Sequence, residues 1–230
     1  MHTETRASAV KIYLFFLFIS LFAVSGCGLD IDFGGGTGND DDVEENEVIM
    51  GFIKEIPDID RNSNLIVRAS VVKDERVACC EDTTSIGNDF YIEGNLDPKA
   101  ELEILESGNE NPPLGTITVP VFPGATVDIQ DISIENGVTN YGYINVDFEG
   151  QVDSKNCFSE TSKTGSIKVT ISSEGSETEV AVNLTSGTNI ERDDERNLPC
   201  EEIVEGRKIR VHKGELLIGN TVDAEEIEIL

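Results

Sequence analysis

A short polar segment carries side-chain oxygens at alternate positions: Asp58, Asp60, Asn62 and Asn64. Calcium prefers oxygen ligands, and calcium-binding loops space them in this way. The segment lacks the glycine that such loops place sixth, and Ala69 stands where a bidentate glutamate would close an EF-hand. The alternative is a polar turn in which Asp and Asn side chains bond their own backbone. Asp58, Asp60 and Asn62 are therefore the candidate calcium ligands, and we expect no other cofactor.

A second chemical feature is a cysteine that follows an apolar run, in the sequence Val24-Ser25-Gly26-Cys27. Arg6 and Lys11 precede the run and small residues end it, as in a secretory signal. The run is too short for a permanent membrane-spanning helix. The ending resembles the bacterial lipobox. This resemblance implies cleavage after residues 1–26, acylation of Cys27 with chains such as palmitate, and a stable lipid anchor.

Because lipid would consume Cys27, four cysteines remain: Cys79, Cys80, Cys157 and Cys200. An even number in an oxidising compartment predicts disulfides, and four cysteines can pair in three ways. Cys157 and Cys200 lie in the same candidate domain, which favours a bridge between them. Cys79 and Cys80 would then be paired with each other or reduced. The chain has no C-x-x-C spacing and no histidine near the pair, so we expect a structural role.

Catalytic chemistry would have to use His212, the only histidine beyond the signal peptide. It falls in a predicted strand, and the chain has no G-x-S-x-G nucleophile motif. Zinc catalysis normally needs several His or Cys ligands. The chain also lacks tryptophan for a sugar-stacking cleft and a glycine-rich phosphate loop followed by a helix. We therefore expect that the protein is not an enzyme.

The charge of the chain restricts its partners. It has 45 acidic and 17 basic residues, and its formal net charge is −28. Nucleic-acid phosphates are bound by clustered Lys and Arg, so a nucleic-acid partner is excluded. Anionic headgroups are repelled as well, and contact with a membrane would depend on the lipid on Cys27. Residues 27–46 combine glycines with an acidic block, which predicts an extended tether.

The elements that must position these residues are strands throughout. From residue 47 onward, short runs of alternating apolar residues are separated by Gly and Pro, with no sustained helical period. Over residues 47–140 this pattern predicts a β-sandwich. Its strands are expected at 48–56, 65–72, 89–93, 101–106, 116–121 and 126–134.

Residues 141–230 predict five further strands, at 144–152, 166–172, 179–184, 208–213 and 222–229. The longest connection separates the third from the fourth, and residues 198–204 within it suit a helical turn. This arrangement favours a small Greek-key barrel of OB type. In the last strand the apolar parity changes between Ala224 and Ile227. One extra residue would restore the face, so we predict a β-bulge near Glu225.

Two resemblances agree with this division. The run 48–53 with Gly51, followed by the segment 83–94 with Gly87 and Phe90, resembles the carboxypeptidase-regulatory-like (prealbumin-like) domain. That family opens with V-x-G-x-V and has a T-x-x-x-G-x-F hairpin, which Asn88-Asp89 lengthens by about one residue in this chain. The resemblance implies a structural or spacer module.

The second half resembles an OB-like domain of unknown function found in exported bacterial proteins. The resemblance rests on the segments 148–152, 180–188, 203–211 and 222–229, which occur in the family's order. It implies no catalytic motif.

The expected protein is all-β, with a prealbumin-like β-sandwich followed by a small five-stranded OB-like barrel. We expect a non-enzymatic, lipid-anchored protein of the cell envelope that serves as a structural or partner-binding module. Gly28, in place of a retention aspartate, favours the outer membrane of a Gram-negative bacterium. Its partner would be an envelope protein or a glycan. The alternative function is calcium-dependent adhesion or ligand binding through the Asp58–Asn64 segment.

Overall fold

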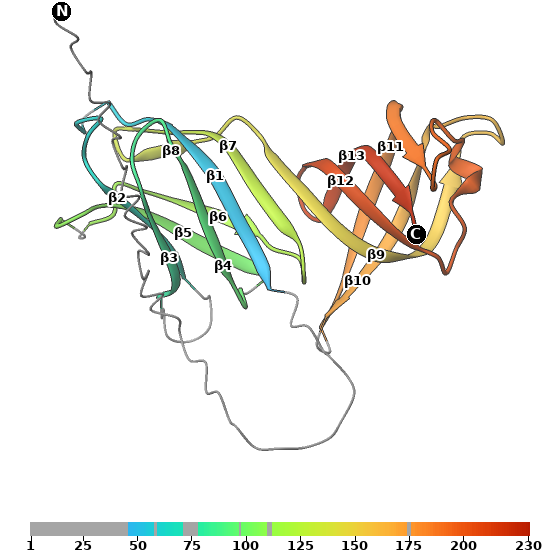
Figure 1. Cartoon of the computed structure of the whole chain (residues 1–230), viewed down its shortest axis with the longest axis horizontal. Helices are drawn as coiled ribbons and strands as arrows, with labels where there is room; N and C mark the ends of the chain where they lie inside the picture. The colour runs from blue at the N-terminus through green and yellow to red at the C-terminus, as the bar shows by residue number, and fades with distance from the viewer. Residues whose placement is uncertain (1–45, 58, 71–77, 97, 110–111, 174–175) are drawn as a thin grey trace, which may run out of the picture. The chain divides into compact units, whose positions relative to one another are not determined.

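The computed structural model describes residues 46–230 except 58, 71–77, 97, 110–111 and 174–175. The expected signal peptide, the lipidated Cys27, nearly all of the tether, and Asp58 lie outside the described residues. The strands of the first half are β1 (Glu47–Glu55), β2 (Leu65–Ser70), β3 (Ala78–Thr84), β4 (Asp89–Gly94), β5 (Lys99–Glu106), β6 (Gly115–Pro120), β7 (Thr126–Glu135) and β8 (Val138–Asn140) (Figure 1). Those of the second half are β9 (Ile144–Cys157), β10 (Gly165–Ser173), β11 (Ser176–Glu191), β12 (Lys208–Leu216) and β13 (Thr221–Ile229).

The first half is sandwich-like, because its strands form two sheets with buried inner faces. Strands β3, β2, β5 and β6 form an antiparallel sheet in that order. In the larger sheet, β1 pairs with β4 antiparallel and with β7 parallel. Alternate residues of these strands are buried in a common hydrophobic core, for example Ile49 and Ile53 on β1, Val67 on β2 and Leu102 on β5. The alternation explains why the predicted inward faces are the buried ones.

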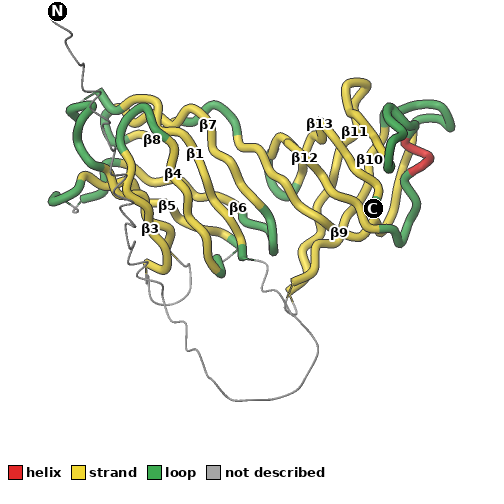
Figure 2. Tube along the Cα trace, viewed as in Figure 1, coloured by secondary structure: helices red, strands yellow, loops and turns green. Residues whose placement is uncertain are grey.

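The five strands of the second half pair in a closed ring, in the order β9, β10, β11, β13, β12 and back to β9. Neighbours are antiparallel except β11 and β13, which are parallel. A short 3₁₀ helix, η1 (Cys200–Glu202), lies in the connection between β11 and β12 and is drawn in red in Figure 2. The helical turn expected within residues 198–204 is therefore present.

The last strand changes parity where a bulge was predicted. Val222, Ala224, Ile227 and Ile229 are all buried, so one extra residue is accommodated at Glu225. The neighbouring strand β12 makes the same adjustment at Lys213, whose φ of 51° lies in the left-handed region. Each strand therefore carries one extra residue at this level. For this reason the β12–β13 register is the same on both sides of the irregularity.

The structure differs from the sequence prediction at several strands. The prediction missed β3 and β8. It also ended β9, β11 and β12 too early, at residues 152, 184 and 213, whereas they continue to Cys157, Glu191 and Leu216. The segment 83–94 is not a hairpin within one sheet, because β3 belongs to the four-stranded sheet and β4 to the larger one. The larger sheet has nine strands because β7 pairs with β9 from Thr126 to Ile129. Among the described residues, no helix has the length and hydropathy that a membrane span requires.

Candidate functional site

The candidate calcium segment forms a polar turn at its described residues. The backbone N–H and the side-chain Nδ2 of Asn62 both donate to Oδ1 of Asp60, at 2.9 and 3.1 Å. The N–H of Ser63 donates to the backbone oxygen of Asp60 at 2.8 Å. In the described part of the chain, no group of three or more His, Cys, Asp or Glu side chains has the geometry of a metal site. Asp60 thus makes the backbone contacts of the polar-turn alternative, while Asp58 lies outside the description.

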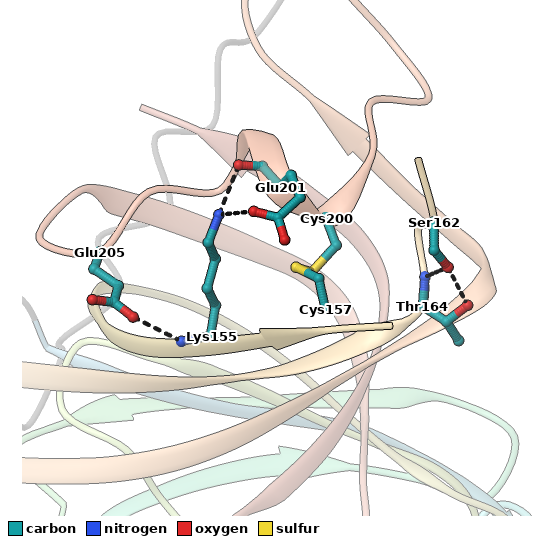
Figure 3. Close-up of a disulfide and its surroundings, with 7 residues drawn as sticks. All are labelled: Lys155, Cys157, Ser162, Thr164, Cys200, Glu201 and Glu205. Carbon is teal, nitrogen blue, oxygen red and sulfur yellow. Dashed lines mark hydrogen bonds and ion pairs between the residues drawn. A yellow bond between two sulfur atoms is a disulfide. The ribbon is translucent and has the colours of Figure 1, made fainter. Parts of the chain in front are cut away.

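The expected Cys157–Cys200 disulfide is present (Figure 3). It joins the last residue of β9 to the first residue of η1, with a Cα–Cα distance of 5.7 Å. Lys155 supports the same junction, because its Nζ donates to the backbone oxygen of Glu201 at 2.8 Å and to its carboxylate at 2.7 Å. Cys200 is fully buried. The bridge therefore fixes the long β11–β12 connection to the barrel wall, which is a structural role.

The pairing of Cys79 and Cys80 stays a prediction. Cys80 lies on β3 and packs, partly buried, against the hydrophobic core. The side chain of Cys79 is outside the description, so its pairing remains a prediction.

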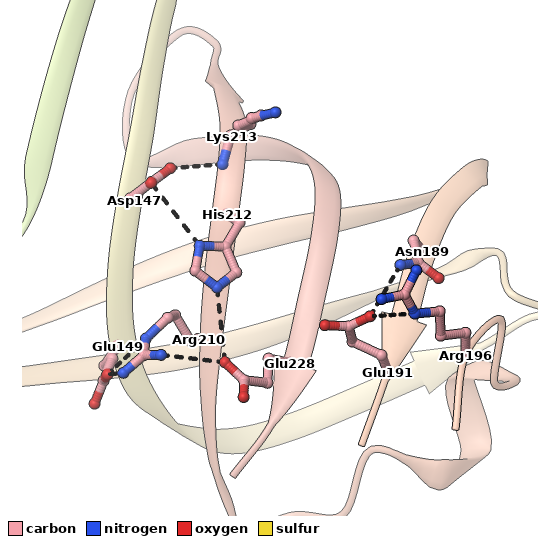
Figure 4. Close-up of polar contacts among 9 residues, drawn as sticks. All are labelled: Asp147, Glu149, Asn189, Glu191, Arg196, Arg210, His212, Lys213 and Glu228. Carbon is pink, nitrogen blue, oxygen red and sulfur yellow. Dashed lines mark hydrogen bonds and ion pairs between the residues drawn. The ribbon is translucent and has the colours of Figure 1, made fainter. Parts of the chain in front are cut away.

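His212 lies on the outer wall of the barrel between two carboxylates (Figure 4). Its Nδ1 is 3.9 Å from Oδ2 of Asp147 on β9, and its Nε2 is 3.7 Å from Oε2 of Glu228 on β13. Asp147 also accepts the backbone N–H of Lys213 at 2.6 Å. The imidazole is 34% exposed. These groups connect three neighbouring strands, and none of these partners is a hydroxyl or thiol that the histidine could activate.

Arg210 extends this network one step along β12. It forms an ion pair with Glu149 on β9 and another with Glu228, the latter at 3.2 Å. Hydrogen bonding to Glu149 raises the pKa of Arg210, and the charge of Glu228 adds to the effect, so the guanidinium keeps its charge. Arg210 therefore takes part in cross-strand charge pairs of the kind that stabilises a sheet, and His212 lies beside them on the same strand.

A different kind of surface lies on the outer face of the β4–β1–β7 part of the large sheet. Three successive outward residues of β1 are apolar and partly exposed: Val48, Met50 and Phe52. Tyr91 stands beside Met50 on β4 and is 52% exposed. On the other side, Met50 is paired with Asp128 of β7.

Carboxylates surround this apolar stripe. Asp89 and Glu93 face outward on β4, on either side of Tyr91, and Asp147 on β9 is paired with Thr126 on β7. We call this surface the acid-rimmed face. Its apolar and aromatic residues are Val48, Met50, Phe52 and Tyr91. Its acids are Asp89, Glu93, Asp128 and Asp147.

The acids of this face are close enough to influence one another. Partial burial raises the pKa of Asp128, and the negative charges of Asp89 and Asp147 raise it further. Gln130 opposes the shift, because its Nε2 donates to both carboxylate oxygens of Asp128 at 2.6 and 2.7 Å. Burial and the Glu93 carboxylate, which accepts the Tyr91 hydroxyl at 3.1 Å, raise the pKa of Tyr91. The face thus combines negative charge with partly exposed apolar area.

This face was not expected from the sequence, although one signal for it is present there. The run 48–53 is apolar at nearly every position, whereas a strand with one solvated face should alternate. Such a run indicates that both faces of β1 are apolar. The acids could not be assigned to this face without the register between β4, β1, β7 and β9.

Comparison of the chain with protein-family models, curated proteins and solved structures returned no match.

Proposed function

We propose that this protein is a non-enzymatic, lipid-anchored module of the bacterial envelope, which binds a partner through the acid-rimmed face. The observation that carries the proposal is the stripe of Val48, Met50 and Phe52. On the barrel strands, by contrast, outward side chains form charge pairs across strands, as Arg210 does with Glu149 and Lys168 does with Glu179. A contiguous apolar patch with a polar rim marks interaction sites on many proteins, and this stripe has both features.

We also propose the finer fold assignment. The ring order, the parallel β11–β13 pair and the helical turn between β11 and β12 support an OB-type barrel. The OB fold is a five-stranded Greek-key barrel that serves as a binding scaffold. Two sheets sharing one core support a prealbumin-like sandwich in the first half. The barrel would then begin near residue 141.

The envelope location rests on the sequence around Cys27. A lipid on this residue would hold the protein at the membrane in spite of its negative charge, because each buried methylene contributes about 0.8 kcal/mol. The test is a Cys27→Ala variant produced in a Gram-negative host with labelled palmitate. We expect the parent protein to carry label and to fractionate with the outer membrane, and the variant to do neither. Label on the variant would contradict the proposal.

Partner binding is tested separately, by photo-crosslinking in intact cells. A photoreactive phenylalanine analogue at Tyr91 samples the acid-rimmed face. The same analogue at Thr118, an exposed residue of β6 on the other sheet, is the matched control. We expect one discrete adduct from position 91 that is absent from position 118. Equal labelling from both positions would contradict a binding role for this face.

A further inference from the structure

We infer that the acid-rimmed face binds a basic, amphipathic polypeptide segment, one that presents Lys or Arg side chains beside apolar ones. This inference rests on the proposed binding role of the face and specifies the chemistry of the partner. It is carried by the way in which acidic and apolar side chains alternate across the sheet.

The geometry of the face suits an extended segment. Met50 lies between Tyr91 on one neighbouring strand and Asp128 on the other, and Val48 lies between Glu93 and Thr126. Neighbouring strands are about 4.8 Å apart, and alternate residues on one strand are about 6.7 Å apart. A carboxylate therefore stands within one strand spacing of the apolar stripe on each side. A segment whose cationic side chains flank apolar ones can reach both.

The acids of this face carry little compensating positive charge, except Asp147, which lies 3.9 Å from the His212 imidazole. In the described part of the chain, Asp89, Glu93 and Asp128 take part in no ion pair with Lys or Arg. The basic residue that follows the stripe on β1 is Lys54, which pairs with Asp131 at 3.7 Å. The charges of these three carboxylates are thus not offset by Lys or Arg, although Glu93 accepts hydrogen bonds from Asn46 and Tyr91 and Asp128 accepts from Gln130. Burial raises the pKa of Asp128, and repulsion from Asp89 and Asp147 adds to the shift; an incoming cation would relieve that repulsion.

Charge complementarity also distinguishes this occupant from others. A second copy of the chain would bring the same acids to the interface, and the net charge of −28 opposes that approach. An anionic lipid surface is repelled in the same way. A metal ion or a polyamine would neutralise the acids but leave Val48, Met50 and Phe52 exposed. A basic amphipathic segment would neutralise the acids and also cover the apolar residues.

The test uses the intact lipidated protein in a non-ionic detergent. The probe is a fluorescein-labelled peptide of alternating Lys and Val, about eight residues long, which is close to the length of a typical strand. A peptide of alternating Glu and Val is the charge-reversed control. We expect saturable binding of the Lys peptide by fluorescence anisotropy and none of the Glu peptide. Raising sodium chloride from about 0.05 to about 0.5 M should weaken binding by screening. Binding of both peptides with equal affinity would overturn the inference.

Matched variants locate the site. Asp89→Asn/Asp128→Asn removes two charges from the face, and Asp193→Asn/Asp194→Asn removes two from an exposed turn elsewhere. We expect the first pair to weaken binding about tenfold, as the loss of facing charges does at other interfaces, and the second to leave it unchanged. Equal weakening by both pairs would show that only net charge matters, and would overturn the inference.

A third variant tests the apolar half of the face. Tyr91→Ala removes the most exposed ring of the face and keeps every charge, and we expect it also to weaken the Lys peptide. Unchanged affinity in Tyr91→Ala would overturn the amphipathic requirement.

If the Lys peptide fails to bind while position 91 still crosslinks in cells, the partner chemistry is wrong and the proposed function stands. If position 91 also fails to crosslink in cells, both the partner chemistry and the proposed binding function are wrong.

Discussion

The carboxylate of Asp82 accepts a hydrogen bond from the backbone N–H of Tyr91 at 2.8 Å, which joins the edges of the two sheets of the sandwich. Asp82 lies on β3, at one end of the four-stranded sheet, and Tyr91 lies on β4, at one end of the larger sheet. The other oxygen of the carboxylate accepts the N–H of Thr83, also at 2.8 Å. An edge strand with unpaired N–H groups can pair with other chains. Asp82 satisfies one such group on β4.

The first prediction concerns this contact. Asp82→Ala removes the acceptor for two backbone N–H groups, so we expect the free energy of unfolding to fall by about 1 to 2 kcal/mol. The measurement is denaturant unfolding followed by circular dichroism. Aggregation, followed by light scattering on warming, should also begin at a lower temperature, because the N–H of Tyr91 on the β4 edge would lack its acceptor. Asp82→Asn keeps an acceptor oxygen and should lose less stability. Equal losses in the two variants would contradict the role assigned to the carboxylate.

The strands that were predicted correctly are those whose burial follows the two-residue period. Ile167, Val169 and Ile171 are an example, since all three are buried as expected. β3 was missed because its run of Glu81, Asp82 and Thr83 shows no apolar alternation, although the strand pairs with β2 over its length.

The end of β11 was misplaced for a related reason. Thr188 stands at a position where alternation predicts an apolar residue, and it is fully buried. Its hydroxyl donates to the backbone oxygen of Ala224 at 2.7 Å and accepts the N–H of Thr185 at 2.8 Å. A threonine satisfied in this way is compatible with the core, but its partners are 36 and 3 residues away, so the sequence alone does not reveal them.

The candidate sites divide in the same way, into those that residue type and spacing indicate and those that depend on strand register. The Cys157–Cys200 bridge could be predicted because cysteines pair and these two share a domain. The position of His212 between Asp147 and Glu228 could not, because it depends on the registers of β9, β12 and β13. The acid-rimmed face likewise requires the pairing of β1 with both β4 and β7.

The second prediction concerns the disulfide. Cys157 and Cys200 are 43 residues apart, and closing a loop of this length stabilises the folded state by about 4 kcal/mol in the chain-entropy model. We expect Cys157→Ala/Cys200→Ala to lower the melting temperature markedly, as should reduction of the parent protein. The doubly substituted protein should show no further change with reductant. An unchanged melting temperature after confirmed reduction of the parent would contradict this role.

The third prediction concerns a close approach between β9 and β10. A Cβ on Gly150 would lie 2.5 Å from Cγ1 of Val169 and 2.8 Å from the backbone oxygen of Thr170. Gly150→Ala should therefore force the strands apart and cost about 1 to 3 kcal/mol of stability. Gly187→Ala is the matched control, because its Cβ would meet only Oγ1 of Thr185 at an ordinary 3.5 Å. Denaturant unfolding of both variants measures the difference, and equal stability would contradict the steric argument.

The fourth prediction concerns the pH dependence of stability. Burial, with the charges of Asp89 and Asp147, raises the pKa of Asp128 in the folded protein above its value in the unfolded chain. A raised pKa means that the folded state holds the proton more tightly, so this stabilisation is complete below the unfolded pKa of about 3.9. It is lost as the pH rises through the folded pKa. At neutral pH the charged carboxylate therefore destabilises the fold relative to a neutral side chain.

Asp128→Asn tests this sign directly. The amide carries no charge and keeps an oxygen that can accept from Gln130, which now donates to Asp128 at 2.6 Å. We expect the variant to melt above the parent protein at pH 7, and the difference to shrink as the pH falls toward 4. Asp194→Asn, which removes an exposed charge on a turn, controls for the change in net charge. If Asp128→Asn melts below the parent at pH 7, or if its advantage grows toward pH 4, the carboxylates of the acid-rimmed face do not repel one another as described. A basic partner would then gain nothing by relieving that repulsion.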